Sequence, residues 1–320
     1  MNWIYRAINY LMSLTTARRT TQVAFVILII LLPIFNIFRY DTTTQELYLF
    51  GNVWKLGLEH GFYIDRSPMG ALHIAFHFFL KAILPWILFL ALFPLFGFIS
   101  GRFFCGWLCP EGTLFELSDF LTLRILGRRN LYVKKSIDPP LADDHRFLYA
   151  GIALVSAFII PLLGGAALTG YFVAPKTVWH QIESWHFTFG VKAGIIGVSI
   201  YIFITSVFVR HVLCKFICAA GLMQMLLGWI SPVSLRLKTD TERMARCTDC
   251  HGCDRACFMN VTPRKNKRDI SCVNCGACID ACNHELSKGK GLLHFNFGNE
   301  NAVQEVDEKT YSTEKRINQR

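Results

Sequence analysis

The sequence predicts an integral membrane protein that is mainly α-helical and carries a small, cysteine-rich α+β domain near its C-terminal end. Three observations lead to this prediction. Of the 320 residues 52% are hydrophobic, four long stretches are almost free of charge, and eight of the 12 cysteines lie between positions 247 and 282. A composition this apolar, with four long uncharged stretches, is typical of a membrane protein.

Four segments are long and apolar enough to cross a bilayer. Each has roughly 18 to 23 residues, or about 27 to 35 Å as a helix, which matches the hydrocarbon core of a membrane. The segments are Thr21–Phe38, Ala82–Ser100, Phe147–Thr169 and Val191–Val209. The first is expected to be a retained helix rather than a cleaved signal, because arginines precede it and no small-residue cleavage site follows.

The distribution of Lys and Arg predicts the orientation of these helices. The loop 101–146 is basic, whereas the loop 170–190 holds only Lys176. Short basic loops favour the cytoplasmic side, so we expect a multi-pass protein of the bacterial inner (cytoplasmic) membrane with both termini cytoplasmic. The net charge of +10 follows mainly from this asymmetry, so a nucleic-acid partner is not required. The basic residues of the loop are Arg102, Arg124, Arg128, Arg129, Lys134, Lys135 and Arg146.

Eight cysteines form two consecutive copies of the spacing C-x2-C-x2-C-x3-C. This spacing is the ligand pattern of bacterial two-cluster ferredoxins, in which three cysteines bind one 4Fe-4S cluster and the fourth binds the other. A zinc site needs only four ligands, disulfides need no matched triplets, and cytoplasmic thiols stay reduced. We therefore assign one cluster to Cys247, Cys250, Cys253 and Cys282, and the second to Cys272, Cys275, Cys278 and Cys257.

The remaining four cysteines indicate an internal repeat. Cys105-x3-Cys109 and Cys214-x3-Cys218 match at an offset of 109 residues, and the apolar segments before them obey the same offset. The simplest account is two parallel hairpin repeats, each a helix out, a helix back and a C-x3-C motif at the cytoplasmic exit. Such repeats would gather the four thiols at one membrane boundary.

The surroundings of these thiols favour reactivity. Pro110 is expected at the first position of a helix that runs to about Gly127, which places Cys109 at a helix N-terminus, where thiolate is favoured. The second copy opens a similar stretch, 221–230, but has Ala219 in place of the proline. The four thiols could bind a further iron–sulfur cluster or copper(I), act as a dithiol, or simply serve as small apolar residues.

Other signals are weaker. His73 and His77 lie four residues apart and could share a helix face that binds copper, haem or a quinone headgroup, although interfacial histidines are more often structural. The sequence has no phosphate-binding loop or nicotinamide fingerprint, and we assign no catalytic residue. The polar tail 298–320 is expected to be disordered.

With these motifs the chain resembles the membrane-bound polyferredoxin family, which comprises NapH/MauN/YccM-type and CcoG/FixG/RdxA-type 4Fe-4S electron-transfer proteins. The resemblance covers roughly residues 20–297 and rests on the motif GRFFCGWLCP at 101–110, RHVLCKFIC at 210–218 and the two ferredoxin runs. The length and four-segment layout are more similar to the NapH group, whereas YDTTTQELYLFG at 40–51 is more similar to the CcoG group. The family's second motif ends in Cys-Pro, and here Ala219 follows the cysteine.

These inferences give the expected organisation and function. We expect a cytoplasmic segment 1–20, a four-helix membrane domain 21–233, a ferredoxin domain 234–297 and the tail. The expected function is relay of electrons between a quinol or cytoplasmic donor and a respiratory or periplasmic redox partner. The resemblance to CcoG implies an alternative, a cupric reductase or copper-handling assembly factor for a respiratory oxidase. A redox-sensing regulator is disfavoured, because no output domain is recognisable.

Overall fold

The computed structural model describes residues 13–54, 68–127, 143–240, 244–265, 270–286 and 291–298. Within these ranges four helical spans are long and apolar enough to cross a membrane: Leu14–Ile34, Ala75–Ser100, His145–Thr169 and Phe189–Val209. The prediction of four apolar membrane-length helices is therefore confirmed. Most of the predicted N-terminal segment, the polar tail beyond residue 298, and the basic residues Arg128, Arg129, Lys134 and Lys135 lie outside the described residues.

The chain divides into two compact units, and each is described by itself. The first contains 1–25, 96–153 and 205–320, and the second contains 26–95 and 154–204. The first unit thus joins the segments around both C-x3-C motifs to the ferredoxin runs. The domain boundaries expected from the sequence stay predictions, as does the hairpin arrangement of the two repeats.

The second unit combines membrane-length helices with a small sheet. The later part of the helix α2 (Leu14–Ile34), from residue 26 on, leads into a three-stranded antiparallel sheet of β1 (Phe38–Asp41), β2 (Glu46–Leu49) and β3 (Asn52–Val53). The first apolar helix thus ends four residues earlier than we expected, because Asn36 adopts the left-handed conformation that terminates helices. The unit also contains α3 (Pro68–Phe78), the π-helical turn η1 (Phe79–Ile83), α8 (Pro175–Ser184) and α9 (Phe189–Ile204). It further contains α4 (Leu84–Ser100) up to residue 95 and α7 (Asp143–Thr169) from residue 154.

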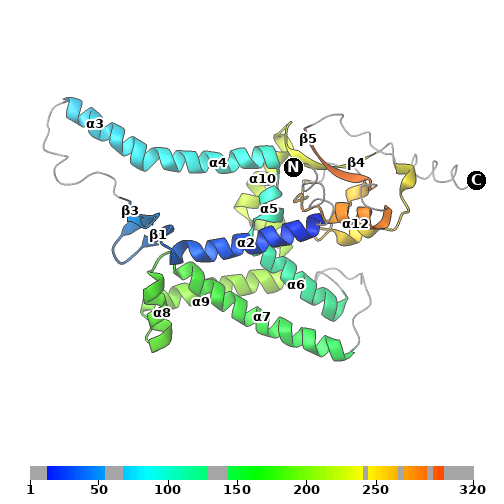
Figure 1. The fold of residues 1–320 in the computed structure, drawn as a ribbon, viewed down its shortest axis with the longest axis horizontal. Helices are drawn as coiled ribbons and strands as arrows, with labels where there is room; N and C mark the ends of the chain where they lie inside the picture. The colour runs from blue at the N-terminus through cyan, green and yellow to red at the C-terminus, as the bar shows by residue number, and fades with distance from the viewer. Residues whose placement is uncertain are drawn as a thin grey trace, which may run out of the picture. The chain divides into compact units, whose positions relative to one another are not determined.

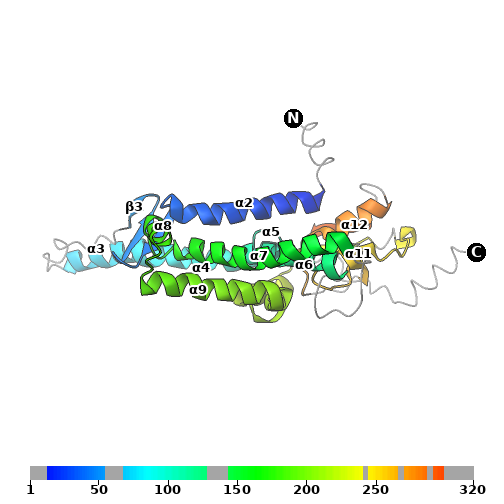
Figure 2. The ribbon, with the colours of Figure 1, turned by 90° about the horizontal axis from the view of Figure 1, so that it is seen from below.

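Small residues let α7 and α9 pack closely in this unit, where Figures 1 and 2 show them side by side. A Cβ atom at Gly165 would lie 2.6 Å from the carbonyl oxygen of Ile195, so only glycine permits this approach. The Ser199 hydroxyl donates to the Pro161 carbonyl oxygen over 3.0 Å. Close backbone contact between small residues is the usual way in which membrane helices associate.

The first unit places short helices around the cysteines. Its two-stranded sheet pairs β4 (Leu235–Thr239) with β5 (Leu293–Phe297) in antiparallel register, from Leu235 opposite Phe297 to Thr239 opposite Leu293. The other elements are α5 (Phe103–Trp107), α6 (Pro110–Leu126), the π-helical turns η2 (Thr205–Val209) and η3 (Leu213–Ile217), α10 (Ala219–Ile230), the 3-10 turns η4 (Met244–Arg246) and η5 (Pro263–Lys265), α11 (Gly252–Ala256) and α12 (Ala277–Leu286).

Asp280 of α12 caps the N-terminal end of α2. Its carboxylate accepts hydrogen bonds from the backbone N–H groups of Leu14 at 3.1 Å and Thr15 at 2.6 Å, and from the Thr15 hydroxyl. A carboxylate at this position satisfies free N–H groups and opposes the positive end of the helix dipole. The cap explains why the helix begins at Leu14, seven residues before the apolar stretch that we identified from the sequence.

The packing of α7 against α9 yields a first prediction. Gly165→Val should destabilise the protein by about 1–3 kcal/mol, because the added methyl groups must displace the α9 backbone. Gly197→Val is the matched control, since a Cβ atom there meets no heavy atom within 4 Å and the cost of valine in a helix is the same. Thermal unfolding in detergent compares the two variants, and equal midpoints would contradict the predicted contact.

Candidate functional site

The eight ferredoxin-type cysteines surround two small cavities in the first unit. One cavity, of about 30 Å³, is lined by Cys247, Cys250, Cys253 and Cys282. The other, of about 20 Å³, is lined by Cys257, Cys272, Cys275 and Cys278. The fourth cysteine of each run therefore lies with the first three of the other run, which is the grouping that we assigned from spacing. Iron binding by these thiols stays a prediction.

The two runs fold alike because left-handed residues recur at the same places. Asp249 and His251 in the first run, and Asn274 and Gly276 in the second, all have φ between 50° and 77°. These turns direct backbone N–H groups toward sulfur: the N–H of Gly252 donates to Cys250 Sγ at 3.4 Å. Successive inward N–H groups form a concave anion site of the kind that holds iron–sulfur clusters.

Burial makes three thiols of these runs weak acids. Burial raises the pKa of Cys253 and of Cys275 to about 11, and it raises the pKa of Cys278 further, with neighbouring cysteines adding to the effect. These three thiols are therefore neutral at pH 7 until a bound metal deprotonates them.

The tertiary structure also brings together the four cysteines of the C-x3-C motifs. The pKa of Cys214 is raised to about 12, chiefly by burial and in smaller part by electrostatic repulsion from Cys109, Cys105 and Cys218. Such mutual repulsion requires that the four sulfur atoms lie near one another. Two motifs 109 residues apart in sequence thus form one site.

The two motifs have the same local geometry. Cys109 and Cys218 each precede a helix, with φ, ψ of −65°, 118° and −65°, 114° respectively. The N–H of Cys109 donates to Phe104 at 3.0 Å, and the N–H of Cys218 donates to the equivalent Leu213 at 2.8 Å. The helix after Cys218 begins at Ala219, as the first begins at Pro110, so the missing proline does not alter the helix start.

One expectation about these thiols is wrong for the metal-free protein. Cys109 does cap α6, and the Gly112 N–H donates to its sulfur at 3.4 Å. However, burial raises the pKa of Cys109 to about 11, with the neighbouring Cys105 adding to the rise. Loss of hydration outweighs the helix N-terminus, so the free thiol is not activated by its position alone.

Two buried polar residues beside the four thiols were missed from the sequence. Arg102 is 3% exposed and donates to the carbonyl oxygens of Cys214 at 2.6 Å and Ser271 at 3.4 Å. Gln224 is 0% exposed, and its Oε1 lies 3.3 Å from Cys105 Sγ. We had counted Arg102 only as a topology signal. Gln224 could have been noticed as a lone amide within the apolar stretch 219–230.

The four-thiol site contacts the second ferredoxin run directly. A Cβ atom at Gly106 would collide with the carbonyl oxygen of Val273, so the motif loop and the cluster loop touch backbone to backbone. The Trp107 indole N–H donates to the Asn274 carbonyl oxygen at 2.9 Å. Cys105 also packs against the small core that contains Val273 and Cys275.

A larger cavity of about 690 Å³ lies between α2, α6 and the ferredoxin helices. Its wall includes a buried ion pair in which Arg18 donates to both carboxylate oxygens of Glu116, at 2.6 and 2.7 Å. Gln22 donates to the same carboxylate at 3.0 Å. Asp119, also on the wall, accepts from Arg210 at 3.1 Å and lies 2.9 Å from a ring nitrogen of His211.

No described group of three His, Cys, Asp or Glu side chains is close enough to bind one metal ion. His73 and His77 share a face of α3 in the second unit, with ring centroids 4.5 Å apart. In an iron–sulfur cluster each thiolate binds a different iron atom, so its cysteines stand farther apart than the ligands of a single ion.

Comparison with known proteins gives two family matches. A family described as "4Fe-4S binding domain" matches twice, at residues 82–129 and 192–238, so each match contains one C-x3-C motif. A family described as "4Fe-4S dicluster domain" matches residues 233–297. No solved structure matches the chain.

Curated relatives are similar over the same region. YccM of Escherichia coli (strain K12) is 26% identical over 61% of this chain and 53% of its own length. The ferredoxin-type protein NapH of the same organism is 23% identical over 60% of this chain and 63% of NapH. RdxA of Cereibacter sphaeroides is 25% identical over 63% of this chain and 45% of RdxA. The chain thus spans about half the length of several of the relatives that it matches.

The four membrane-length helices, the two groups of ferredoxin-type cysteines and these matches together support a membrane polyferredoxin-type family of 4Fe-4S proteins.

Proposed function

We propose that this protein relays electrons through three 4Fe-4S clusters, two in the ferredoxin runs and a third held by Cys105, Cys109, Cys214 and Cys218. When bound, these clusters supply reversible one-electron exchange. The observation that carries the proposal is the backbone contact between Gly106 and Val273, which joins the four-thiol site to the second ferredoxin run.

The residues around the four thiols fit a cluster. Four sulfur atoms from two equivalent C-x3-C motifs lie near one another in a partly buried place. Gln224 Nε2 and Arg102 Nε are both buried there without a hydrogen-bond acceptor. An unpaired buried donor costs about 1–3 kcal/mol, so two of them beside thiols indicate a missing acceptor. The sulfur atoms of an anionic cluster are suitable acceptors.

The cavity between α2, α6 and the ferredoxin helices supports a quinol donor. Its volume of about 690 Å³ lies in the range of small-molecule sites. Val23, Leu117 and Phe120 give it apolar walls, and Glu116 and Asp119 place carboxylate oxygens on the wall that can accept hydrogen bonds from quinol hydroxyls. Phe258, which follows Cys257 in sequence, also lines it, so a bound headgroup would lie near the second cluster.

The cellular setting of the proposal comes from the sequence. We propose a bacterial inner membrane location with cytoplasmic termini, because the basic residues concentrate in the loop 101–146. The acceptor would be a respiratory or periplasmic redox protein. The relatives named NapH and "Nitrogen fixation protein FixG" suggest respiratory or nitrogen-fixation systems as the setting.

Copper handling is the second candidate function. Four soft thiol ligands gathered at one membrane edge favour copper(I). The same site cannot hold both copper and a third cluster, so metal content separates the two functions.

The number of irons tests the proposal. Protein purified without oxygen should contain about twelve irons per chain, since three 4Fe-4S clusters are expected. Replacement of Cys105 and Cys214 by serine should lower this to about eight, because only the membrane cluster loses ligands. About eight irons in the unchanged protein, together with stoichiometric copper(I) that the same replacements abolish, would instead establish the copper function.

The contact between the two sites yields another prediction. Trp107→Phe keeps the aromatic ring but removes the N–H that donates to Asn274, so a buried carbonyl oxygen loses its partner at a cost of about 1–3 kcal/mol. We expect weaker magnetic coupling between the reduced clusters by electron paramagnetic resonance. Trp185→Phe, at a residue 84% exposed, should change neither stability nor coupling. Unchanged coupling in the Trp107 variant would exclude this contact as the link.

The quinol cavity can be tested by blocking it. Leu123→Trp places a bulky ring at the cavity wall and should reduce photoaffinity labelling by an azidoquinone several-fold. Leu154→Trp is the control, because Leu154 is 64% exposed in the second unit. Equal labelling of both variants, or labelling outside α2, α6, α12 and the segment 256–258, would refute this location for the quinol.

A further inference from the structure

Gln224 lies in an arrangement that satisfies only half of its amide. Its side chain is completely buried, and its carbonyl oxygen Oε1 accepts from the Cys105 thiol at 3.3 Å. The amide nitrogen Nε2 is buried with no acceptor. The amide nitrogen carries two N–H groups, so this orientation leaves two hydrogen-bond donors without an acceptor.

If Cys105 binds a metal, the amide of Gln224 must donate a hydrogen bond to the sulfur and no longer accept one from it. A thiolate that binds a metal has no proton to donate and can only accept hydrogen bonds. Rotation of the amide by about 180° exchanges Oε1 and Nε2 and points an N–H group at the sulfur. The rotation moves no other atom of Gln224, since the two ends of the amide have nearly the same shape.

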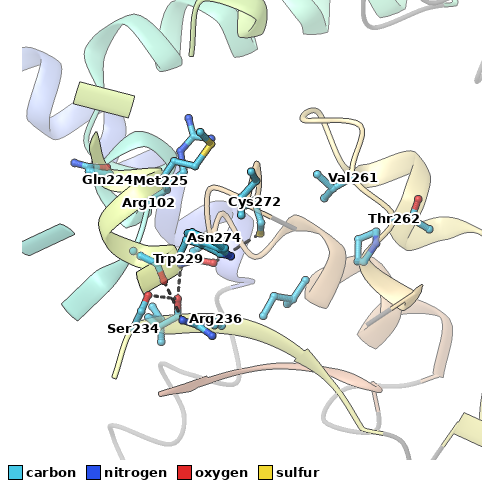
Figure 3. Close-up of a pocket in the computed structure, with 16 residues that line it drawn as sticks. Arg102, Gln224, Met225, Trp229, Ser234, Arg236, Val261, Thr262, Cys272 and Asn274 are labelled. Carbon is cyan, nitrogen blue, oxygen red and sulfur yellow. Dashed lines mark hydrogen bonds between the residues drawn. The ribbon is translucent and has the colours of Figure 1, made fainter. Parts of the chain in front are cut away.

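Arg102 adds a buried positive charge to the same place. Figure 3 shows Arg102, Gln224 and Met225 beside one another, with Asn274 and Cys272 close by on the ferredoxin side. Burial raises the pKa of Cys105, and the charge of Arg102 acts in the opposite direction. Gly221 keeps the space for this guanidinium, because a Cβ atom there would lie 3.2 Å from Arg102 Nη2.

The repeat shows that these donors are specific to one half of the site. At the offset of 109 residues Arg102 corresponds to His211, and Gln224 corresponds to Phe115. In that second half, His211 pairs with Asp119 at 2.9 Å, and its ring lies against Phe115 with centroids 5.7 Å apart. A structural need common to both repeats would have placed similar residues at both positions. The polar pair instead singles out Cys105.

We infer that Gln224 is a positioning residue that donates a hydrogen bond from Nε2 to the Cys105 thiolate and, together with Arg102, raises the reduction potential of the cluster at the four thiols. The inference rests on the proposed third cluster. Reduction adds negative charge, and hydrogen bonds to cluster sulfurs and a nearby cation stabilise the reduced state more than the oxidised state.

The test is a redox titration of the anaerobically purified full chain, followed by electron paramagnetic resonance. Gln224→Leu and Gln224→Met introduce apolar side chains of similar size that cannot donate a hydrogen bond. In both, the potential of one cluster should fall while the other two stay unchanged, and iron content should remain that of the unchanged protein. Met225→Leu is the control, because Met225 lines the same cavity and its replacement removes no hydrogen-bond donor.

The possible outcomes separate the two proposals. About eight irons and two cluster signals in the unchanged protein would overturn the third cluster and this inference with it. Three signals with no shift in either Gln224 variant would overturn the role of Gln224 alone and leave the relay intact. A shift in the Met variant identifies the lost donor even if the Leu variant does not fold.

Discussion

The first unit depends on one steric constraint, the contact of Gly106 with the carbonyl oxygen of Val273. Because no side chain separates the two backbones, Trp107 can reach Asn274 and Cys105 can pack against the core beside Cys275. Any larger residue at position 106 would push the C-x3-C loop away from the ferredoxin run. The same glycine brings a carbonyl oxygen within 3.2 Å of the Gln22 amide, which ties α2 to the loop.

The charged side chains in the same region form ion pairs. Glu116 pairs with Arg18, and Asp119 pairs with both Arg210 and His211. Asp280 accepts hydrogen bonds from the first residues of α2. A buried ion pair adds little net stability, but loss of one partner costs several kcal/mol because the other charge stays buried. These pairs therefore fix one arrangement of α2, α6 and the ferredoxin helices. The neutral amide of Gln224 differs from these charged pairs, since its buried Nε2 has no acceptor among the described residues.

Several features could be predicted from sequence because they depend on local chemistry. The four apolar spans follow from length and hydropathy, and the helix after Cys109 follows from Pro110 and ends at Gly127 as expected. The limits of α2 could not be predicted, since its start depends on the distant Asp280 and its end on the conformation of Asn36. The thiolate expected at Cys109 was wrong because burial, which sequence does not reveal, opposes the helix dipole.

The sequence by itself predicted which thiols group together, because cysteine spacing limits which thiols can reach a common cluster. It also determined the repeat, since matched residues recur at an offset of 109. Only the tertiary structure decided what surrounds these thiols. The structure brings together residues that lie about 90 to 170 positions apart in sequence, such as Arg102 and Ser271 with a separation of 169. Only this packing places the polar side chains of Arg102, Gln224, Glu116 and Asp119 at the proposed sites. Such meetings depend on the packing of whole helices, which no local pattern of residues encodes.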